Sequence, residues 1–248
     1  MLKNTYIHIP GIGSTIEQRI WKSGIKGWED YLKNHDIIRL PRAKKRTLLS
    51  GVEESIEQLS AGNHLFFATR LPAALRWRAY QVFREKTAYV DIETTGLSAE
   101  SRITLIGIYN GKDTKTFIRG INIEEAPSEL SKYKQLITFN GARFDLPFIE
   151  HEFPGTVSHL HIDLLYPLKK IGYSGGLKKI ENTLGINRSK ETASLTGLDA
   201  VRLWRRYEHG DESSLDLLIE YNEEDVRNLE KIIEMVYPGL IEKEMKFM

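Results

Sequence analysis

The chain has 248 residues, of which 41% are hydrophobic and 28% are charged. A chain of this size can form one large domain, or a catalytic domain with a smaller companion, around a substantial core. It contains no cysteine, which excludes disulfides, thiolate chemistry and cysteine-bound zinc. Its apolar runs fall short of the ~18 residues that a membrane span needs. Residues 1–4 lack a signal-peptide core, so we expect a cytoplasmic protein without a membrane partner.

Charge is distributed unevenly along the chain, although the net charge is only +1. Residues 1–86 hold 15 Lys and Arg against 8 Asp and Glu, whereas residues 87–248 hold 20 against 26. A basic first part and an acidic second part suit a nucleic-acid grip joined to a metal site, although chance also produces such asymmetry. We therefore expect a basic, mostly helical region over residues 1–86 and a second domain over residues 87–248.

The first region shows helical patterns over residues 1–33 and 42–86, with one helix expected to begin at Leu71-Pro72. Residues 9–13, Ile-Pro-Gly-Ile-Gly, resemble the hairpin of helix-hairpin-helix DNA-binding modules, in which backbone N–H groups approach a phosphate. Residues 5–9 look like a strand instead of the first helix of that motif, so the motif is half present. A nucleic-acid contact and a purely structural turn both remain open. A basic cluster that could grip a backbone, or simply begin a solvated helix, comprises Arg39, Arg42, Lys44, Lys45 and Arg46.

The character of the sequence changes after Lys86. Residues 87–93 are rich in β-formers and end in a turn signal, Thr94-Thr95-Gly96. Further strands are expected over residues 103–109 and 114–118, because Asn110-Gly111 between them is a strong hairpin turn.

The remaining pattern alternates strands and helices. Short strands fit residues 136–139 and 159–165, each followed by a helix, the first from about Phe144. The chain then looks helical from about Leu177, and the last helix is expected over residues 214–236. Together these elements predict an α/β fold with a mixed five-stranded sheet flanked by helices.

Asp91 and Glu93 lie two residues apart on the first predicted strand, so both carboxylates point to the same face. Two acids on one buried face repel each other unless a cation is present, and Mg²⁺ or Mn²⁺ prefers such oxygen ligands. The alternative is a solvated pair on an edge strand.

Two further acids follow later in the chain. Asp145 begins a predicted helix, where the helix dipole alone would favour an acid. Tyr221 and Asp225 are four residues apart on the last helix and share one face, although a core tyrosine and a surface acid are the simpler interpretations. Glu223 and Glu224 point elsewhere and are expected to be solvated.

The order and spacing of these pieces resemble the exonuclease motifs of the DEDD superfamily. The first motif is residues 91–97, Asp-Ile-Glu-Thr-Thr-Gly-Leu, and the second is residues 140–148, Asn-Gly-Ala-Arg-Phe-Asp-Leu-Pro-Phe. Tyr221-x-x-x-Asp225 is similar to the third motif of the tyrosine subclass, since the histidine subclass would need His at Glu220. The second motif resembles the proofreading domain of family-B DNA polymerases. The absence of polymerase sequence and stretches such as residues 173–181 look more like the stand-alone YprB-like predicted exonucleases, and the resemblance covers about residues 87–235.

This resemblance implies an RNase H-like fold and a 3′–5′ exonuclease. It implies two divalent ions, Mg²⁺ or Mn²⁺, on the four carboxylates Asp91, Glu93, Asp145 and Asp225. Tyr221 would orient or deprotonate the attacking water, and orientation is the better role because a tyrosine pKa near 10 makes a poor base. Contacts to the substrate are implied for Thr94, Leu97 and Asn140, with a core position as the alternative for Leu97.

Other polar residues lie outside these motifs. Asp163 is expected to cap a helix or face the substrate and not to bind metal. His159 and His161 are not expected to be ligands. Three cations that could bind phosphates or lie on a solvated helix face are Lys178, Lys179 and Arg188.

Three functions compete on this evidence. The first is an exonuclease acting on the 3′ end of DNA or RNA, which we expect to be single-stranded. The second is an RNase H-like, structure-specific endonuclease, and the third is a catalytically silent nucleic-acid-binding module. The five motif residues argue against a silent binding module. The second motif and the Tyr221-x-x-x-Asp225 motif argue against an endonuclease. The choice between DNA and RNA depends on pocket shape, and protein partners leave no signal in the sequence.

Overall fold

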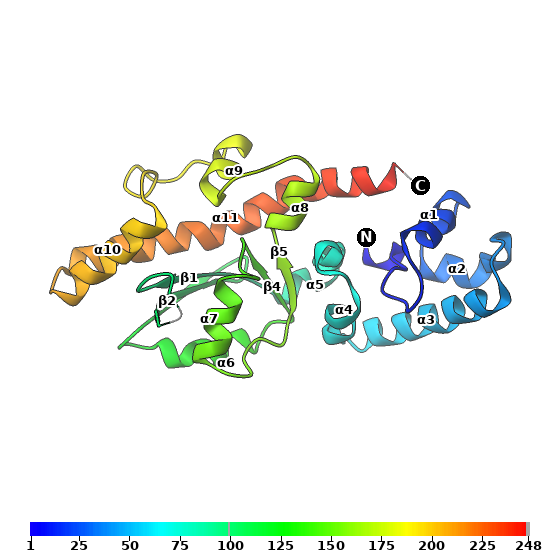
Figure 1. The fold of residues 1–248 in the computed structure, drawn as a ribbon, viewed down its shortest axis with the longest axis horizontal. Helices are drawn as coiled ribbons and strands as arrows, with labels where there is room; N and C mark the ends of the chain where they lie inside the picture. The colour runs from blue at the N-terminus through cyan, green and yellow to red at the C-terminus, as the bar shows by residue number, and fades with distance from the viewer. Residues whose placement is uncertain (99, 247–248) are drawn as a thin grey trace.

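The computed structural model describes residues 1–98 and 100–246. At its centre lies a five-stranded sheet with the strand order β3-β2-β1-β4-β5 (Figure 1). The strands are β1 (Thr87–Thr94), β2 (Ile103–Tyr109), β3 (Thr114–Ile118), β4 (Gln135–Thr138) and β5 (Leu160–Asp163). Because β1 pairs antiparallel with β2 and parallel with β4, the sheet is mixed, and the predicted fold class is confirmed.

The central strand β1 presents different side chains to the two faces of the sheet. Val90 and Ile92 pack in one apolar cluster with Ile149, whereas Tyr89 packs in another with Val226. Successive side chains of a strand point to opposite faces. Asp91 and Glu93 therefore share the face of Tyr89, as predicted from their spacing.

Helices cover both faces of the sheet. Figure 1 shows α6 and α7 on one side and α8, α9, α10 and α11 on the other. Their bounds are α6 (Ala126–Leu130), α7 (Asp145–Glu152), α8 (Leu165–Lys170), α9 (Leu177–Leu184), α10 (Gly197–Glu208) and α11 (Glu212–Met245), with a 3-10 turn, η5, at Ile123–Glu125. The carboxylate-bearing face of β1 is thus the face that α11 crosses.

The last helix is longer than predicted. The sequence predicted an end near Val236, yet α11 continues through Pro238 to Met245. Tertiary packing explains the extension. The Tyr237 ring lies 5.8 Å from that of Trp77, and Leu240 is fully buried. The end of α11 therefore belongs to the interface with the N-terminal region.

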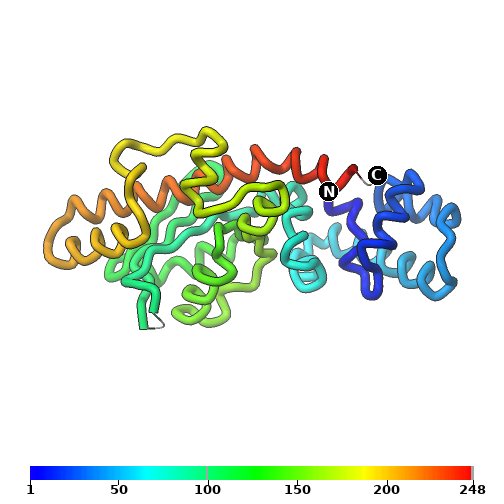
Figure 2. The backbone as a smooth tube through the Cα atoms, turned by 45° about the horizontal axis from the view of Figure 1, so that its top comes forward, coloured from blue at the N-terminus to red at the C-terminus, as the bar shows by residue number. Residues whose placement is uncertain are grey.

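That N-terminal region is mostly helical, as predicted, and occupies the end of the molecule opposite α10 (Figures 1 and 2). Its helices are α1 (Ser14–Lys22), α2 (Trp28–Asn34), α3 (Arg42–Ser60), α4 (His64–Arg70) and α5 (Tyr80–Phe83). Its 3-10 segments are η1 (Leu2–Asn4), η2 (His35–Ile37), η3 (Ala73–Ala79) and η4 (Arg84–Lys86). The helix expected from Leu71-Pro72 is thus a 3-10 segment followed by one short α-helix.

The strand expected over residues 5–9 is wrong. The N–H groups of Tyr6 and Ile7 donate to the Glu17 carboxylate, at 2.7 and 3.2 Å. This buried acid on α1 therefore takes the hydrogen bonds that a partner strand would need, and the segment forms turns.

Gly11 and Gly13 adopt part of the hairpin geometry that the sequence suggested. Gly11 has a φ of 73°, which favours glycine, and Gly13 caps the start of α1. The Gly11 carbonyl accepts a hydrogen bond from Lys44 Nζ at 2.5 Å, which ties the turn to α3. Nucleic-acid contact by this turn stays a prediction.

Within the described residues, each helix is too short or too polar to cross a lipid bilayer.

Candidate active site

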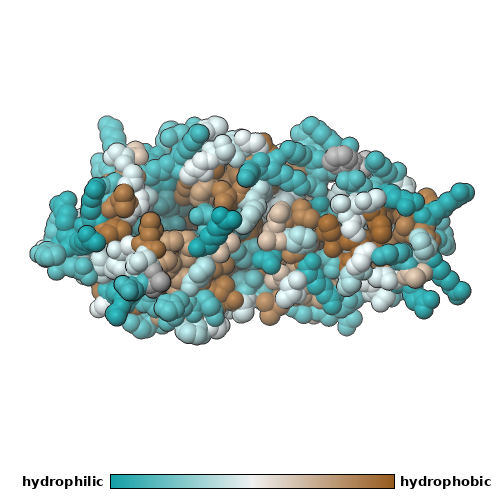
Figure 3. All heavy atoms as spheres, viewed as in Figure 1, coloured by the Kyte–Doolittle hydropathy of each residue, from teal (hydrophilic) through white to brown (hydrophobic). Residues whose placement is uncertain are grey.

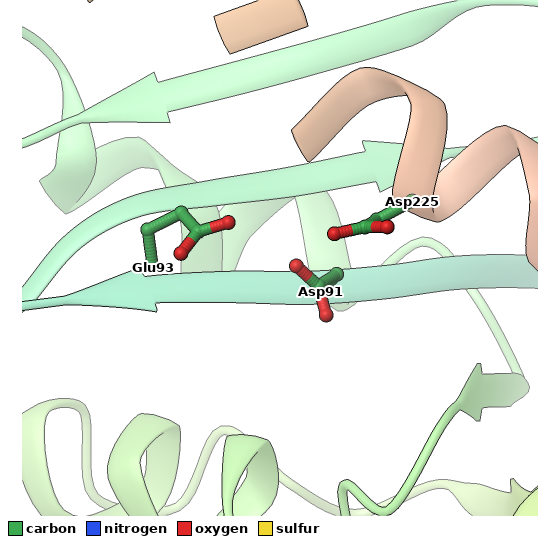
Figure 4. Close-up of side chains that lie close together, drawn as sticks. All are labelled: Asp91, Glu93 and Asp225. Carbon is green, nitrogen blue, oxygen red and sulfur yellow. The ribbon is translucent and has the colours of Figure 1, made fainter. Parts of the chain in front are cut away.

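Asp91 and Glu93 project from β1 toward α11, and Asp225 projects back from α11 toward the strand (Figure 4). Each of the three offers one carboxylate oxygen, and these oxygens lie within 4.8 Å of one another. Oxygens on opposite sides of one Mg²⁺ are about 4 Å apart, because each Mg–O distance is about 2.0–2.1 Å. Small side-chain movements would therefore let all three bind one divalent ion.

Asp145, the fourth predicted acid, lies beside this group and not within it. It stands in the first turn of α7 and is only 3% exposed. Its Oδ1 accepts a hydrogen bond from the N–H of Ile92, the residue between Asp91 and Glu93, at 3.2 Å. This bond holds the Asp145 carboxylate against β1. The helix brings Asp145 to the edge of the cluster, where it lines the same pocket.

Burial and mutual repulsion disfavour the charged forms of these acids. Burial raises the pKa of Asp145 to about 7 and that of Asp225 to about 6. The pKa values of Asp91 and Glu93 are also raised well above their ordinary values, first by burial and then by the charge of Asp225. A bound cation would relieve this cost, so the donor set fits hard divalent metal ions.

A buried arginine contacts the cluster, which the sequence analysis did not predict. Arg188 donates to both oxygens of Glu181 at 2.7 Å and also to Asp225 Oδ1. Its side chain is 4% exposed, so it does not lie on a solvated helix face. It lies in a loop after α9, where local periodicity gives no signal.

Tyr221 lines the same pocket as the carboxylates and packs against two cations, Lys178 and Arg188. It is 8% exposed, and Lys178 Nζ lies 4.9 Å from its ring centre. Lys178 also donates to the Thr192 carbonyl at 2.8 Å, so its ammonium is engaged internally, whereas Lys179 is exposed. Burial, followed by the charge of Asp225, raises the pKa of Tyr221 far above its ordinary value, so the hydroxyl keeps its proton at neutral pH.

The acids lie in a pocket of about 680 Å³. The three residues predicted to contact substrate line it, namely Thr94, Leu97 and Asn140. Leu97 is 79% exposed, which rules out a core position for this side chain. Asn140 has a φ of 61°, and its N–H donates to Asp163 Oδ1 at 2.7 Å.

One wall of the pocket comes from α10 and was not predicted. Apolar side chains gather on the molecular face over α10 and the neighbouring sheet (Figure 3). Leu198 is 64% exposed and lines the pocket with Arg205. The sequence did carry a signal for this helix, because Thr196 and Asp199 form a reciprocal capping box at its start.

Four further polar residues, Asp163, Glu224, His159 and His161, form internal hydrogen bonds. Asp163 ends β5 and does not begin a helix; besides Asn140 it accepts from the N–H groups of Ala142 and Leu165. Glu224 is not fully solvated as expected, because it accepts from the Ser189 N–H at 2.7 Å. The two buried histidines have structural partners: His159 contacts the Leu130 carbonyl and His161 the Thr138 hydroxyl.

Solved structures resemble the fold at low sequence identity. The chain is similar to the family B DNA polymerase from the hyperthermophilic archaeon Pyrobaculum calidifontis, with 15% identity and a TM-score of 0.52. That match covers 64% of this chain and 25% of the polymerase, so the chain spans about a quarter of that protein. The EXO domain of Nibbler from Aedes aegypti matches at 11% identity with a TM-score of 0.45, over 69% of this chain and 84% of the domain.

No curated protein matches the chain. A family model does: residues 88–237, which include every acid of the cluster and all of the sheet except Thr87, match the model of the RNase H superfamily. The matched segment is more than half of the chain. This chain belongs to the RNase H superfamily.

Proposed function

We propose that the chain is a metal-dependent 3′–5′ exonuclease that hydrolyses the terminal phosphodiester bonds of DNA or RNA. The observation that carries this proposal is the convergence of Asp91, Glu93 and Asp225, whose carboxylate oxygens lie within 4.8 Å of one another. The superfamily membership and the motif order support a phosphodiester substrate.

The four acids would hold two divalent ions, Mg²⁺ or Mn²⁺. Asp91, Glu93 and Asp225 form the tighter group, and Asp145 adds a carboxylate at its edge. Such ions supply a water of lowered pKa and stabilise charge on the attacking and leaving oxygens of an in-line displacement.

Tyr221 would orient the attacking water and not deprotonate it. The raised pKa of Tyr221 leaves its hydroxyl protonated, so it can donate one hydrogen bond and accept another. Lys178 and Arg188 lie against its ring at 4.9 and 5.5 Å, which restricts where the ring can move. This packing suits a positioning role.

The substrate end would enter between the two apolar walls of the pocket. Leu97 follows β1, and Leu198 lies in the first turn of α10; both line the pocket. Two exposed leucines beside buried acids suit a terminal nucleobase better than a stacked duplex, because a base separated from its neighbours exposes an apolar face. We propose further that Thr94 and Asn140 contact the terminal nucleotide and that Arg205 contacts a phosphate.

The basic N-terminal region would contact only nucleotides of the substrate that lie far from the cleaved bond. It lies at the opposite end of the molecule from α10 (Figure 1). We propose it as an auxiliary contact for the strand and not as part of the active site.

The test is a digestion of matched single-stranded DNA, single-stranded RNA and duplex, each labelled at the 5′ end, with Mg²⁺ or Mn²⁺. The proposal expects a ladder that shortens stepwise from the 3′ end and is absent for the Asp91→Ala variant. A single internal cut would indicate a structure-specific endonuclease instead. Binding without any cleavage in either metal would indicate a silent binding module and refute the proposal.

A further inference from the structure

Asn222 follows Tyr221 on α11 and is fully buried against the sheet. Its Nδ2 donates to Asp91 Oδ2 at 2.9 Å and also reaches the Asp91 carbonyl oxygen at 3.3 Å. The carbonyl oxygen can only accept, so the amide must turn its NH₂ group toward Asp91. The hydrogen bonds therefore fix which end of the Asn222 amide faces Asp91.

The sheet makes room for this contact at one position. Gly107 on β2 is the register partner of Asp91 across the antiparallel pair. A Cβ added to Gly107 would lie 1.8 Å from Asn222 Oδ1 and 2.9 Å from its Cγ. Because atoms cannot approach so closely, the absence of a side chain at Gly107 is what admits the asparagine.

The arrangement leaves one polar atom unsatisfied. Among the described residues, Asn222 Oδ1 is buried without a hydrogen-bond partner. Burying such an atom costs about 1–3 kcal/mol, so packing alone does not favour asparagine here. A leucine of similar shape would avoid that cost. We therefore take the hydrogen bond from Nδ2 to Asp91 as the reason that asparagine occupies position 222.

We propose that Asn222 is a positioning residue that fixes the Asp91 carboxylate in the orientation needed to bind a divalent cation. The inference rests on the proposed function, because it assumes that Asp91 is a metal ligand. Groups that orient metal ligands typically contribute about 10–100-fold to metal affinity or activity.

The chain offers a matched control in Gln135 on β4. It too is a fully buried amide, donating to a side chain, the Thr87 hydroxyl, at 2.8 Å and to a backbone carbonyl, that of Tyr80, at 3.5 Å. Its Oε1 also lacks a partner among the described residues. Gln135 is therefore like Asn222 in burial and hydrogen bonding but pairs with the start of β1, away from the acids.

The experiment measures Mn²⁺ affinity by titration, together with the thermal midpoint, for the Asn222→Ala, Asn222→Leu and Gln135→Ala variants of the 248-residue chain. Asn222→Leu removes the unpaired Oδ1 but also the donor to the Asp91 carboxylate, so the metal-free thermal midpoint should change little, whereas Mn²⁺ should bind about 10–100-fold more weakly. Asn222→Ala should lose similar affinity, whereas Gln135→Ala should bind Mn²⁺ like the wild type. A folded Asn222→Leu variant with wild-type Mn²⁺ affinity would overturn the inference.

A second variant keeps the test decisive if a change at Asn222 prevents folding. Gly107→Ala retains the amide but displaces it, so it should also weaken Mn²⁺ binding. In the Asn222→Leu or Asn222→Ala background, Gly107→Ala should cost little further affinity, because the amide it displaces is gone. Wild-type Mn²⁺ affinity in folded Gly107→Ala would contradict the inference. A wild-type protein that neither binds Mn²⁺ nor cleaves would instead refute the proposed function, and the inference with it.

Discussion

Two buried charge clusters contact α11, one at its C-terminal end and one nearer its middle, at Asp225, and they differ in balance. At its C-terminal end, Arg78 bonds Glu17 and Glu244, and Lys170 also pairs with Glu244, so two cations meet two acids. At the cluster of Asp91, Glu93, Asp145 and Asp225, Arg188 contacts Asp225 but is shared with Glu181, so it can neutralise at most one of the acids. Burial alone does not mark a functional site, whereas an unbalanced buried charge does, because it calls for an external cation.

The largest expected effect is the loss of nucleic-acid cleavage when an acid of the unbalanced cluster is replaced. Asp225→Asn keeps the shape of the side chain but removes a ligand charge, so cleavage should fall at least about 10²–10³-fold, as for loss of a group that stabilises transition-state charge. The metal-free thermal midpoint should stay equal or rise, since one repulsive charge is gone. Rate and melting measurements on the same preparation check both. Near-normal cleavage would remove Asp225 from the active site.

The balanced cluster should respond in the opposite way. Arg78→Ala leaves Glu17 and Glu244 buried without their guanidinium, which should cost about 3–5 kcal/mol of unfolding free energy. Denaturant unfolding measures this loss. Cleavage per folded molecule should change little, because the cluster lies far from β1's acids. A variant of unchanged stability would show that the pairing contributes no net free energy.

A smaller effect is expected for the tyrosine beside the acids. Tyr221→Phe retains the buried ring but removes the hydroxyl, so the cleavage rate should fall about tenfold or more while substrate binding changes little. Single-turnover rates and binding titrations separate the two quantities. Equal losses in rate and binding would mean that Tyr221 grips the substrate and does not act on the water.

The smallest effect concerns the pH dependence of metal-free stability. Folding raises the pKa values of Asp145 to about 7 and Asp225 to about 6, so between about pH 4 and pH 7 these two groups bind more protons in the folded state than in the unfolded one. The buried His8 and His161 act in the opposite direction, because burial lowers their pKa values to about 4 and about 3. Relative to Asp225→Asn, whose histidines are unchanged, the thermal midpoint of the metal-free wild type should therefore fall as pH rises through this range.

Added Mg²⁺ should restore the midpoint at pH 8 and do little at pH 5, where protons compete for the same carboxylates. If the midpoints of the wild type and of Asp225→Asn change equally between pH 5 and pH 8 without metal, the repulsion inferred among the acids is absent.

The two regions also differ in how far local sequence predicts them. Strands β2 and β3 have the predicted bounds because the Asn110-Gly111 turn and the flanking β-formers are local signals. The segment before α1 was misread as a strand because its hydrogen bonds go to Glu17, whose burial no local pattern reveals. The last helix similarly extends beyond its predicted end at residue 236, because its final turns pack against the N-terminal region.

The site shows the same limit. The motif residues could be proposed because their types and spacing recur together, but their supporting residues could not. Arg188 contacts Asp225 across 37 residues, and Asn222 contacts Asp91 across 131. Such contacts depend on how α11 crosses β1, and neither residue type is unusual where it stands in the sequence.

The most direct test of the unbalanced cluster is anomalous diffraction from crystals grown with Mn²⁺. We expect an anomalous peak within coordination distance of Asp91, Glu93 and Asp225, which should be lost in Asp225→Asn crystals. Well-ordered carboxylates without such a peak, at saturating Mn²⁺ and neutral pH, would contradict the claim that these acids form a metal centre.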